Sequence, residues 1–89
     1  MKIQIDPHTL ERAKERGTNE DEIKDVVYTG VAIPAKHGQT GKAKVYEFMK
    51  KRHGKYYKQK MVEVIYTVEK NIAVTVTTYV FYGKWESKK

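Results

Sequence analysis

The side chains with the clearest chemical potential lie at four-residue intervals near the start of the chain: His8, Arg12 and Arg16. On an α-helix this spacing puts them on one stripe, because each residue turns the helix by about 100°. A neutral imidazole can accept a proton, and guanidinium groups bind phosphate through paired hydrogen bonds. The stripe predicts a site that holds a phosphodiester and moves a proton. The alternative is a solvated face on which the arginines pair with Glu11, Glu15 or acids of a second helix.

A second candidate site lies in the middle of the chain, where basic and aromatic residues alternate. This pattern suits a nucleic-acid strand, since cations meet phosphates and aromatic rings stack on bases. The alternative is a lysine-rich strand edge that resists aggregation. The residues expected to contact nucleic acid here are Lys50, Lys51, Arg52, Lys55, Tyr56 and Lys58, with His53 as a further titratable group.

A third candidate is a row of hydroxyl groups in the last strand, Thr75, Thr77 and Tyr79. These hydroxyls could orient a phosphate or a ribose, although threonine and tyrosine are also simply good strand formers. The histidines at positions 8, 37 and 53 lack metal-ligand spacing, so we expect no metal site and no cofactor.

Charge points to a polyanionic partner. The chain carries 18 Lys and Arg against 11 Asp and Glu, a net charge of +7. Residues 1–30 hold more acids than bases, whereas residues 36–60 hold eleven basic side chains, two of them histidines, and Glu47 as their one acid. A positive field of this kind attracts nucleic acid.

Length and composition predict a single domain over residues 1–89, with a frayed tail at about 83–89. There are no cysteines, and no apolar run approaches the roughly 18 residues that span a bilayer. The N-terminus lacks the apolar stretch of a signal peptide. We therefore expect a cytoplasmic protein with no membrane contact.

Local signals predict a short strand over residues 1–5 and then two helices. Asp6-Pro7 supplies an N-cap and a first-turn proline, and Gly17 is a left-handed stop after a helix over residues 7–16. Asn19 and Glu22 resemble a capping box that opens a second helix, which ends near Gly30.

The C-terminal half predicts strands over residues 45–49, 61–68 and 72–82, with the last two joined as a hairpin through residues 69–71. Residues 35–44 and 50–60 are expected to be loops or frayed strand ends. In the last strand, alternation puts the aliphatic face (Ile72, Val74, Val76, Val80) under the helices and leaves the Thr/Tyr face partly open. The predicted fold is α+β, with two N-terminal helices packed on a twisted antiparallel sheet.

The pattern H-x-x-x-R-x-x-x-R-G, followed by E-I-x-x-V-V and a late V-T-V-T-T-Y strand, resembles a prokaryotic family of small proteins related to RelE/ParE-type toxins. The resemblance covers residues 5–80. It implies a RelE-toxin-like fold, metal-free endoribonuclease activity, RNA as substrate (free or on the ribosome) and a small acidic antitoxin as partner.

If the chain is a ribonuclease, His8 would act as base or acid and the two stripe arginines would hold the phosphate. His53 or Tyr79 would supply the complementary proton. Two alternatives stay open: a nucleic-acid-binding module without catalysis, and a toxin-fold protein that acts through a protein partner whose chain pairs with its sheet edge.

Overall fold

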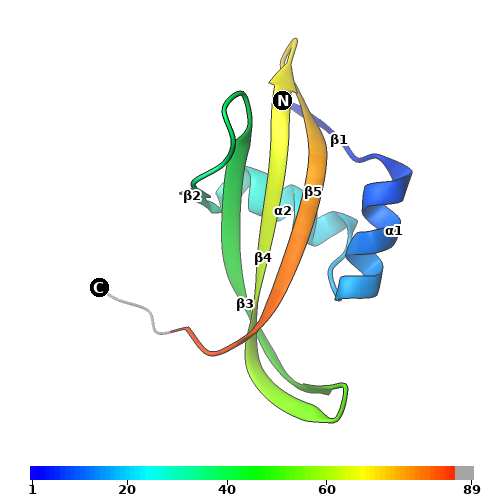
Figure 1. The fold of residues 1–89 in the computed structure, drawn as a ribbon, viewed down its shortest axis with the longest axis vertical. Helices are drawn as coiled ribbons and strands as arrows, with labels where there is room; N and C mark the ends of the chain where they lie inside the picture. The colour runs from blue at the N-terminus through cyan, green and yellow to red at the C-terminus, as the bar shows by residue number, and fades with distance from the viewer. Residues whose placement is uncertain (86–89) are drawn as a thin grey trace.

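The computed structural model describes residues 1–85, which fold into two helices and a five-stranded sheet (Figure 1). The sheet order is β1-β5-β4-β3-β2. The α+β class is confirmed. The sheet is mixed rather than antiparallel, however, because β1 runs parallel to β5. The elements are β1 (Lys2–Gln4), α1 (Pro7–Arg16), α2 (Glu20–Thr29), β2 (Val31–Ile33), β3 (Thr40–Arg52), β4 (Lys55–Glu69) and β5 (Ile72–Gly83).

Both helices begin where their capping residues predict. The Asp6 carboxylate accepts a hydrogen bond from the backbone N–H of His8 at 2.9 Å, and Pro7 occupies the first turn of α1. Gly17 ends α1 with a φ of 105°, the left-handed conformation that glycine adopts without strain. The Asn19 side chain accepts from the N–H of Glu22 at 2.9 Å and caps α2.

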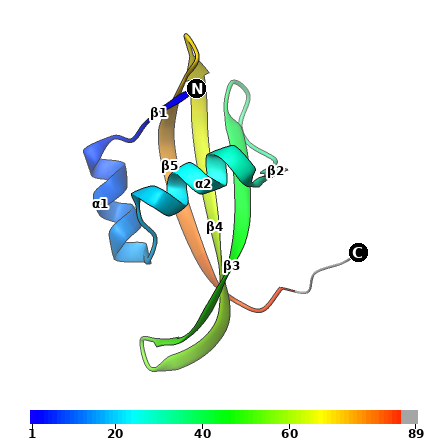
Figure 2. The ribbon, with the colours of Figure 1, turned by 180° about the vertical axis from the view of Figure 1, so that it is seen from behind.

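The helices cover one face of the sheet, with α2 crossing it and α1 beside β5 (Figure 2). The apolar face of α2 packs on the middle strand, where Val62 and Val64 are fully buried. Burying this apolar surface supplies the main driving force for docking helices too short to be stable alone. The helical residues of the core are Ala13, Ile23, Val26 and Val27.

The strands are longer than predicted. Residues 40–44 and 50–52 belong to β3 and residues 55–60 to β4, so most of the stretches expected to be loops are paired backbone. Their lysines and glycines have low strand propensity, but pairing with a neighbouring strand overrides this weak preference. Two-residue turns with positive φ, His53-Gly54 and Lys70-Asn71, close the two hairpins.

The predicted faces of β5 are wrong in its first half. Thr75 pairs with Tyr66 and Thr77 pairs with Ile65, which leaves Val76 without a partner. This bulge reverses the alternation, because an extra residue shifts every later side chain to the other face. Ala73 and Thr75 therefore face the core and Val76 is exposed, whereas Tyr79 and Phe81 do lie on the open face.

The ordered chain continues beyond residue 83, where the tail was expected to start. Gly83 belongs to β5, and the backbone N–H of Trp85 donates to the Gln59 side chain at 2.7 Å. The remainder of the predicted tail, residues 86–89, lies outside the described part of the chain.

A buried cation joins the two helices to the sheet. Lys60 of β4 is 8% exposed, and its Nζ donates to the Gly17 carbonyl and to the Glu22 carboxylate, both at 2.8 Å. The same carboxylate oxygen accepts from the Thr18 hydroxyl at 2.8 Å. The carbonyl at the end of α1 and the first turn of α2 thus share one ammonium group.

Replacing Lys60 with Met should lower the free energy of unfolding by about 3 kcal/mol, because the partly buried Glu22 carboxylate loses its cation. Urea unfolding followed by circular dichroism measures this. Lys58→Met, two residues along the same strand at an exposed position, should change stability by less than about 0.5 kcal/mol. Equal losses in the two variants would contradict the role given to Lys60.

Candidate nucleic-acid interface

The predicted stripe on α1 lines a pocket between this helix and β5. His8, Arg12 and Arg16 form one wall, and Thr77 lies opposite on the strand. The pocket has a volume of about 200 Å³ and is open to solvent. Its remaining lining residues are Asp6, Thr9, Val76 and Thr78. Three of the predicted catalytic residues and one predicted binding residue are therefore neighbours.

The two arginines of the stripe differ in their surroundings. Arg16 is half-buried. Its Nη1 donates a hydrogen bond to the Thr78 carbonyl at 2.5 Å, and its guanidinium lies over the Tyr79 ring, 5.7 Å from the ring centroid. Arg12 is exposed. Within residues 1–85, none of the ion pairs involves either arginine, so the arginines do not pair with Glu11, Glu15 or the acids of α2 as the alternative interpretation required.

The basic and aromatic segment forms a two-stranded ribbon that extends beyond the sheet. The pairing of β4 with β5 ends at Gln59 and Gly83, whereas β3 and β4 stay paired as far as Arg52 and Lys55. A bulge at Met49, where φ is 52°, separates the ribbon from the regular part of β3. We call residues 50–58 the basic ribbon. It contains no acidic residue.

The basic ribbon bends toward α1 (Figures 1 and 2). Arg52 Nη2 donates to the Glu15 carbonyl at the end of the helix at 2.8 Å. Its guanidinium also lies over the Tyr82 ring, 4.9 Å from the centroid, while the Tyr82 hydroxyl donates to the Arg16 carbonyl at 2.7 Å. The ribbon and the pocket therefore occupy the same side of the molecule.

Close packing at Gly17 holds this arrangement in place. A Cβ atom at Gly17 would lie 2.0 Å from the Tyr82 hydroxyl and 3.1 Å from Arg52 Nη1. Phe48 and Tyr57 pack against Tyr82, with ring centroids 5.1 and 5.5 Å away. The bend of the ribbon is thus supported by several contacts rather than by Arg52 alone.

The structure does not bring His53 to the pocket. It lies in the turn of the ribbon, whose tip contacts the C-terminal end of α1, whereas His8 lies in the first turn of that helix. Tyr79 is nearer, since its ring contacts Arg16, but it lies on the open face of the sheet and not in the pocket. The guanidinium of Arg52, which was expected to contact nucleic acid, instead contacts the Glu15 carbonyl and the Tyr82 ring.

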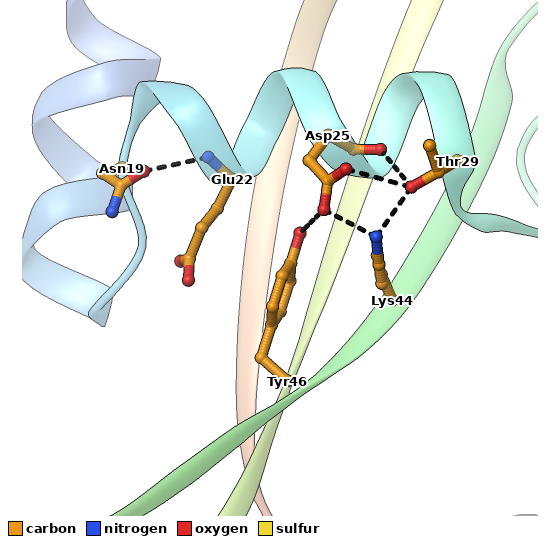
Figure 3. A network of polar contacts seen from close by, with 6 residues as sticks. All are labelled: Asn19, Glu22, Asp25, Thr29, Lys44 and Tyr46. Carbon is orange, nitrogen blue, oxygen red and sulfur yellow. Dashed lines mark hydrogen bonds and ion pairs between the residues drawn. The ribbon is translucent and has the colours of Figure 1, made fainter.

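Two of the lysines in residues 36–60 form contacts within the fold and do not contribute to the exposed positive surface. Lys60 is the buried cation described above. Lys44 donates to Asp25 Oδ2 at 2.7 Å and to the Thr29 hydroxyl at 2.8 Å, and the Tyr46 hydroxyl donates to the same carboxylate oxygen at 2.6 Å (Figure 3). The positive surface is therefore concentrated at the ribbon, where the cations are exposed apart from Arg52: Lys50, Lys51, Lys55 and Lys58.

Sequence reasoning missed two groups of the pocket. Asp6 was identified as a helix cap, yet it also lines the pocket. Thr78 is 1% exposed, and among the described residues its hydroxyl has no hydrogen-bond partner. The Val76 bulge brings Thr78 to the buried face, and no local sequence signal marked that bulge.

Comparisons with known proteins identify no relative: no family model, no curated protein and no solved structure matches the chain. Among residues 1–85, no helix is both long and apolar enough to cross a membrane. The same residues contain no group of three or more histidine and acidic side chains that could hold a metal ion.

The Asp25 network should make stability depend on pH in acid. Hydrogen bonds from Lys44 and Tyr46 hold the pKa of Asp25 below its ordinary value of 3.8. A carboxylate with a lowered pKa stabilises the folded state above its ordinary pKa, and this contribution disappears as the pH falls through the lower, folded-state value.

We therefore expect the melting temperature of Asp25→Asn to fall less than that of the wild type between about pH 5 and pH 2. Thermal unfolding across this range measures the difference. Asp21→Asn replaces an exposed aspartate of the same helix and should follow the wild-type curve. Parallel curves for the wild type and Asp25→Asn would contradict the assignment.

Proposed function

We propose that this protein is a metal-free endoribonuclease of the RelE/ParE toxin type, with a RelE-like fold, and that it cleaves RNA in the pocket between α1 and β5. The observation that carries the proposal is the meeting of one imidazole and two guanidinium groups without an ion-pair partner among the described residues, at His8, Arg12 and Arg16. These groups suit a phosphodiester, because guanidinium groups bind phosphate oxygens and an imidazole transfers protons near neutral pH.

The chemistry follows from these groups. His8 removes the proton from a ribose 2′-hydroxyl, and the 2′-oxygen attacks the adjacent phosphorus atom. Arg12 and Arg16 stabilise the extra negative charge of the pentacovalent phosphorane. The bond from phosphorus to the 5′-oxygen breaks, and the imidazolium returns its proton to that oxygen. The products are a 2′,3′-cyclic phosphate and a 5′-hydroxyl. Because His53 lies at the tip of the ribbon and not in the pocket, we assign both proton transfers to His8.

The basic ribbon supports binding of the RNA strand. Its exposed lysines continue the positive surface from the end of α1, and the exposed Tyr56 offers a ring for base stacking. As a toxin, the protein would work in the cytoplasm on free or ribosome-bound RNA and would be held in check by a small acidic antitoxin.

A second candidate function is RNA binding without cleavage. It is favoured by the position of the exposed lysines on the ribbon, outside the lining of the pocket, since they can bind phosphates whether or not His8 is productively placed. The cleavage experiment distinguishes the two functions, because a binding protein leaves the RNA intact.

His8→Ala and Arg12→Ala should each slow cleavage of a single-stranded RNA by about 10²–10³-fold, through loss of the base or of phosphorane stabilisation. Gel analysis of end-labelled RNA in EDTA measures the rate, and a 2′-deoxy nucleotide at the cleaved position should block the reaction. The matched controls His37→Ala and Lys14→Ala remove an exposed imidazole and an exposed cation outside the pocket. Intact RNA, or equal rates in all four variants, would rule out the proposed activity.

Removing Lys51 and Lys58 together should weaken RNA binding and lower the slope of log affinity against log salt by about 1.4, since each phosphate contact to a single strand contributes about 0.7. Fluorescence anisotropy with labelled RNA measures both quantities. The control pair Lys2→Ala and Lys70→Ala removes exposed lysines at the other end of the sheet and should leave the slope close to wild type. An unchanged slope in the ribbon variant would contradict its role.

A further inference from the structure

A second polar pocket lies on the face of the sheet opposite the helices, where the basic ribbon meets the regular strands. Tyr46 and Lys60 bond to side chains of α2, so they point toward the helices. Because side chains alternate along a strand, Glu47 and Gln59 point to the opposite face. The pocket has a volume of about 270 Å³, and its lining residues are Glu47, Met49, Lys58, Gln59, Lys84 and Trp85. Among the described residues, it shares none with the α1–β5 pocket.

A carboxylate and an amide lie side by side in this pocket. Glu47 and Gln59 are directly opposite each other in the β3–β4 ladder, which puts their Cβ atoms about 5 Å apart. The side-chain oxygen of Gln59 accepts from the backbone N–H of Trp85 at 2.7 Å, so its NH2 group is the part that can donate to a ligand. Glu47 takes part in none of the ion pairs within residues 1–85, although Lys58 and Lys84 line the same pocket. Its two carboxylate oxygens can therefore accept from a ligand.

An indole ring forms one wall of the pocket. After β5 the chain turns toward β4, and the side chain of Trp85 lies over Gly83 (Figure 1). A Cβ atom at Gly83 would be 3.6 Å from Cη2 of the indole and 3.9 Å from each of the two ring atoms bonded to it, so the ring turns a face to the strand. Trp85 is half-buried, and its other face points away from the strand. That outer face can stack on a planar ligand.

The β3 side of the pocket contains a residue in an unusual backbone conformation. Met49 has a φ of 52°, in the left-handed region that a side chain makes unfavourable. The other non-glycine residues with positive φ in the described part of the chain, His53, Lys70 and Asn71, lie in hairpin turns that require it. Met49 lies within β3 and is 57% exposed. Its thioether lines the pocket, and such strain away from a turn is typical of ligand-binding positions.

We infer that this pocket binds the base of a guanine nucleotide, either free or within a single-stranded nucleic acid. The guanine ring stacks on the outer face of Trp85. The Glu47 carboxylate accepts hydrogen bonds from the ring N1–H and the 2-amino group, and the Gln59 NH2 group donates to the 6-oxygen. Lys58 and Lys84 at the rim bind the phosphate, so the site holds base and phosphate together.

Guanine fits these two polar groups better than the other bases do. Its pairing edge carries two adjacent N–H donors, which match the two oxygens of the Glu47 carboxylate. Adenine and cytosine have one amino group beside a ring nitrogen that is itself an acceptor, and this nitrogen would repel the second carboxylate oxygen. Uracil has a single N–H between two carbonyl oxygens. The pocket is smaller than the roughly 300–1,000 Å³ of sites for drug-sized ligands, which suits one base with its sugar and phosphate outside.

The guanine site is independent of the proposed function. A mononucleotide has no internucleotide bond to cleave, so its binding can be measured whether or not the protein is a ribonuclease. Absence of RNA cleavage would leave the guanine site in place, and absence of guanine binding would leave the α1–β5 pocket in place.

The chain contains one tryptophan, so its fluorescence reports on this pocket directly. GMP should quench the emission of the full-length protein to saturation and should bind at least about tenfold more tightly than AMP, whose N1 atom accepts rather than donates. AMP also controls for light absorption by the added nucleotide. IMP, which lacks the 2-amino group, should bind at least about fivefold more weakly than GMP.

A short strand of 2′-O-methyl nucleotides, with one guanine among uracils, identifies the source of the base. Tighter binding of this strand than of GMP assigns the site to nucleic acid, and tighter binding of GMP assigns it to a free nucleotide. The 2′-O-methyl groups remove the hydroxyl needed for cleavage, so binding alone is measured.

Glu47→Gln should lower the affinity for GMP at least about tenfold and should remove the preference for GMP over IMP, because an amide cannot accept both hydrogen bonds. The matched control is Glu63→Gln, which replaces a carboxylate on the same face of β4 but outside the pocket and should bind GMP like the wild type. The indole N–H signal in NMR spectra gives a second measure of binding in each variant.

Three results would overturn the inference. The first is that GMP neither quenches Trp85 nor shifts its indole N–H signal. The second is equal affinity for GMP and AMP, since stacking and phosphate contacts alone would then account for binding. The third is an unchanged preference for GMP over IMP in Glu47→Gln, because the carboxylate would then not contact the base.

Discussion

The buried ammonium group of Lys60 fixes how the two helices sit on the sheet. It joins three parts of the chain that are distant in sequence: the last carbonyl of α1 at Gly17, the first turn of α2 at Glu22, and the middle strand of the sheet. Two short helices with a three-residue link between them could pack at many angles. A shared cation that is almost fully buried favours the angle that satisfies all its partners.

That angle decides what α1 presents to solvent. With its C-terminal end fixed over β4, the helix lies beside β5, where the Tyr82 hydroxyl binds the Arg16 carbonyl. The stripe that begins at His8 then faces the strand across an open pocket. Arg52 of the basic ribbon donates a hydrogen bond to the same end of α1. The fixed end of the helix therefore lies next to the positively charged ribbon.

The β5 and β3 parts of the sheet differ in what covers them. On the β5 side, α1 covers much of the strand, and the polar pocket between them is suited to an anion. On the β3 side, β2 is too short to cover its neighbour, and an apolar pocket adjoins free backbone. The bulges at Val76 and Met49 contribute to this difference, because the first brings Thr78 to the buried face and the second interrupts the regular pairing of β3 with β4 after Glu47.

Features that depend on near neighbours could be predicted from the amino-acid sequence. The caps at Asp6 and Asn19, the left-handed stop at Gly17, the α1 stripe and the hairpin before β5 all follow from residues a few positions apart. Which lysines stay exposed depends on the folded chain, because Lys44 and Lys60 pair with acidic residues of α2. The tertiary structure also decided the face of each residue in the first half of β5, the length of β3 and β4, and the distance between His8 and His53. These depend on pairing between strands and on contacts across the fold, whose energies come from residues far apart in the chain and leave no periodic signal along it.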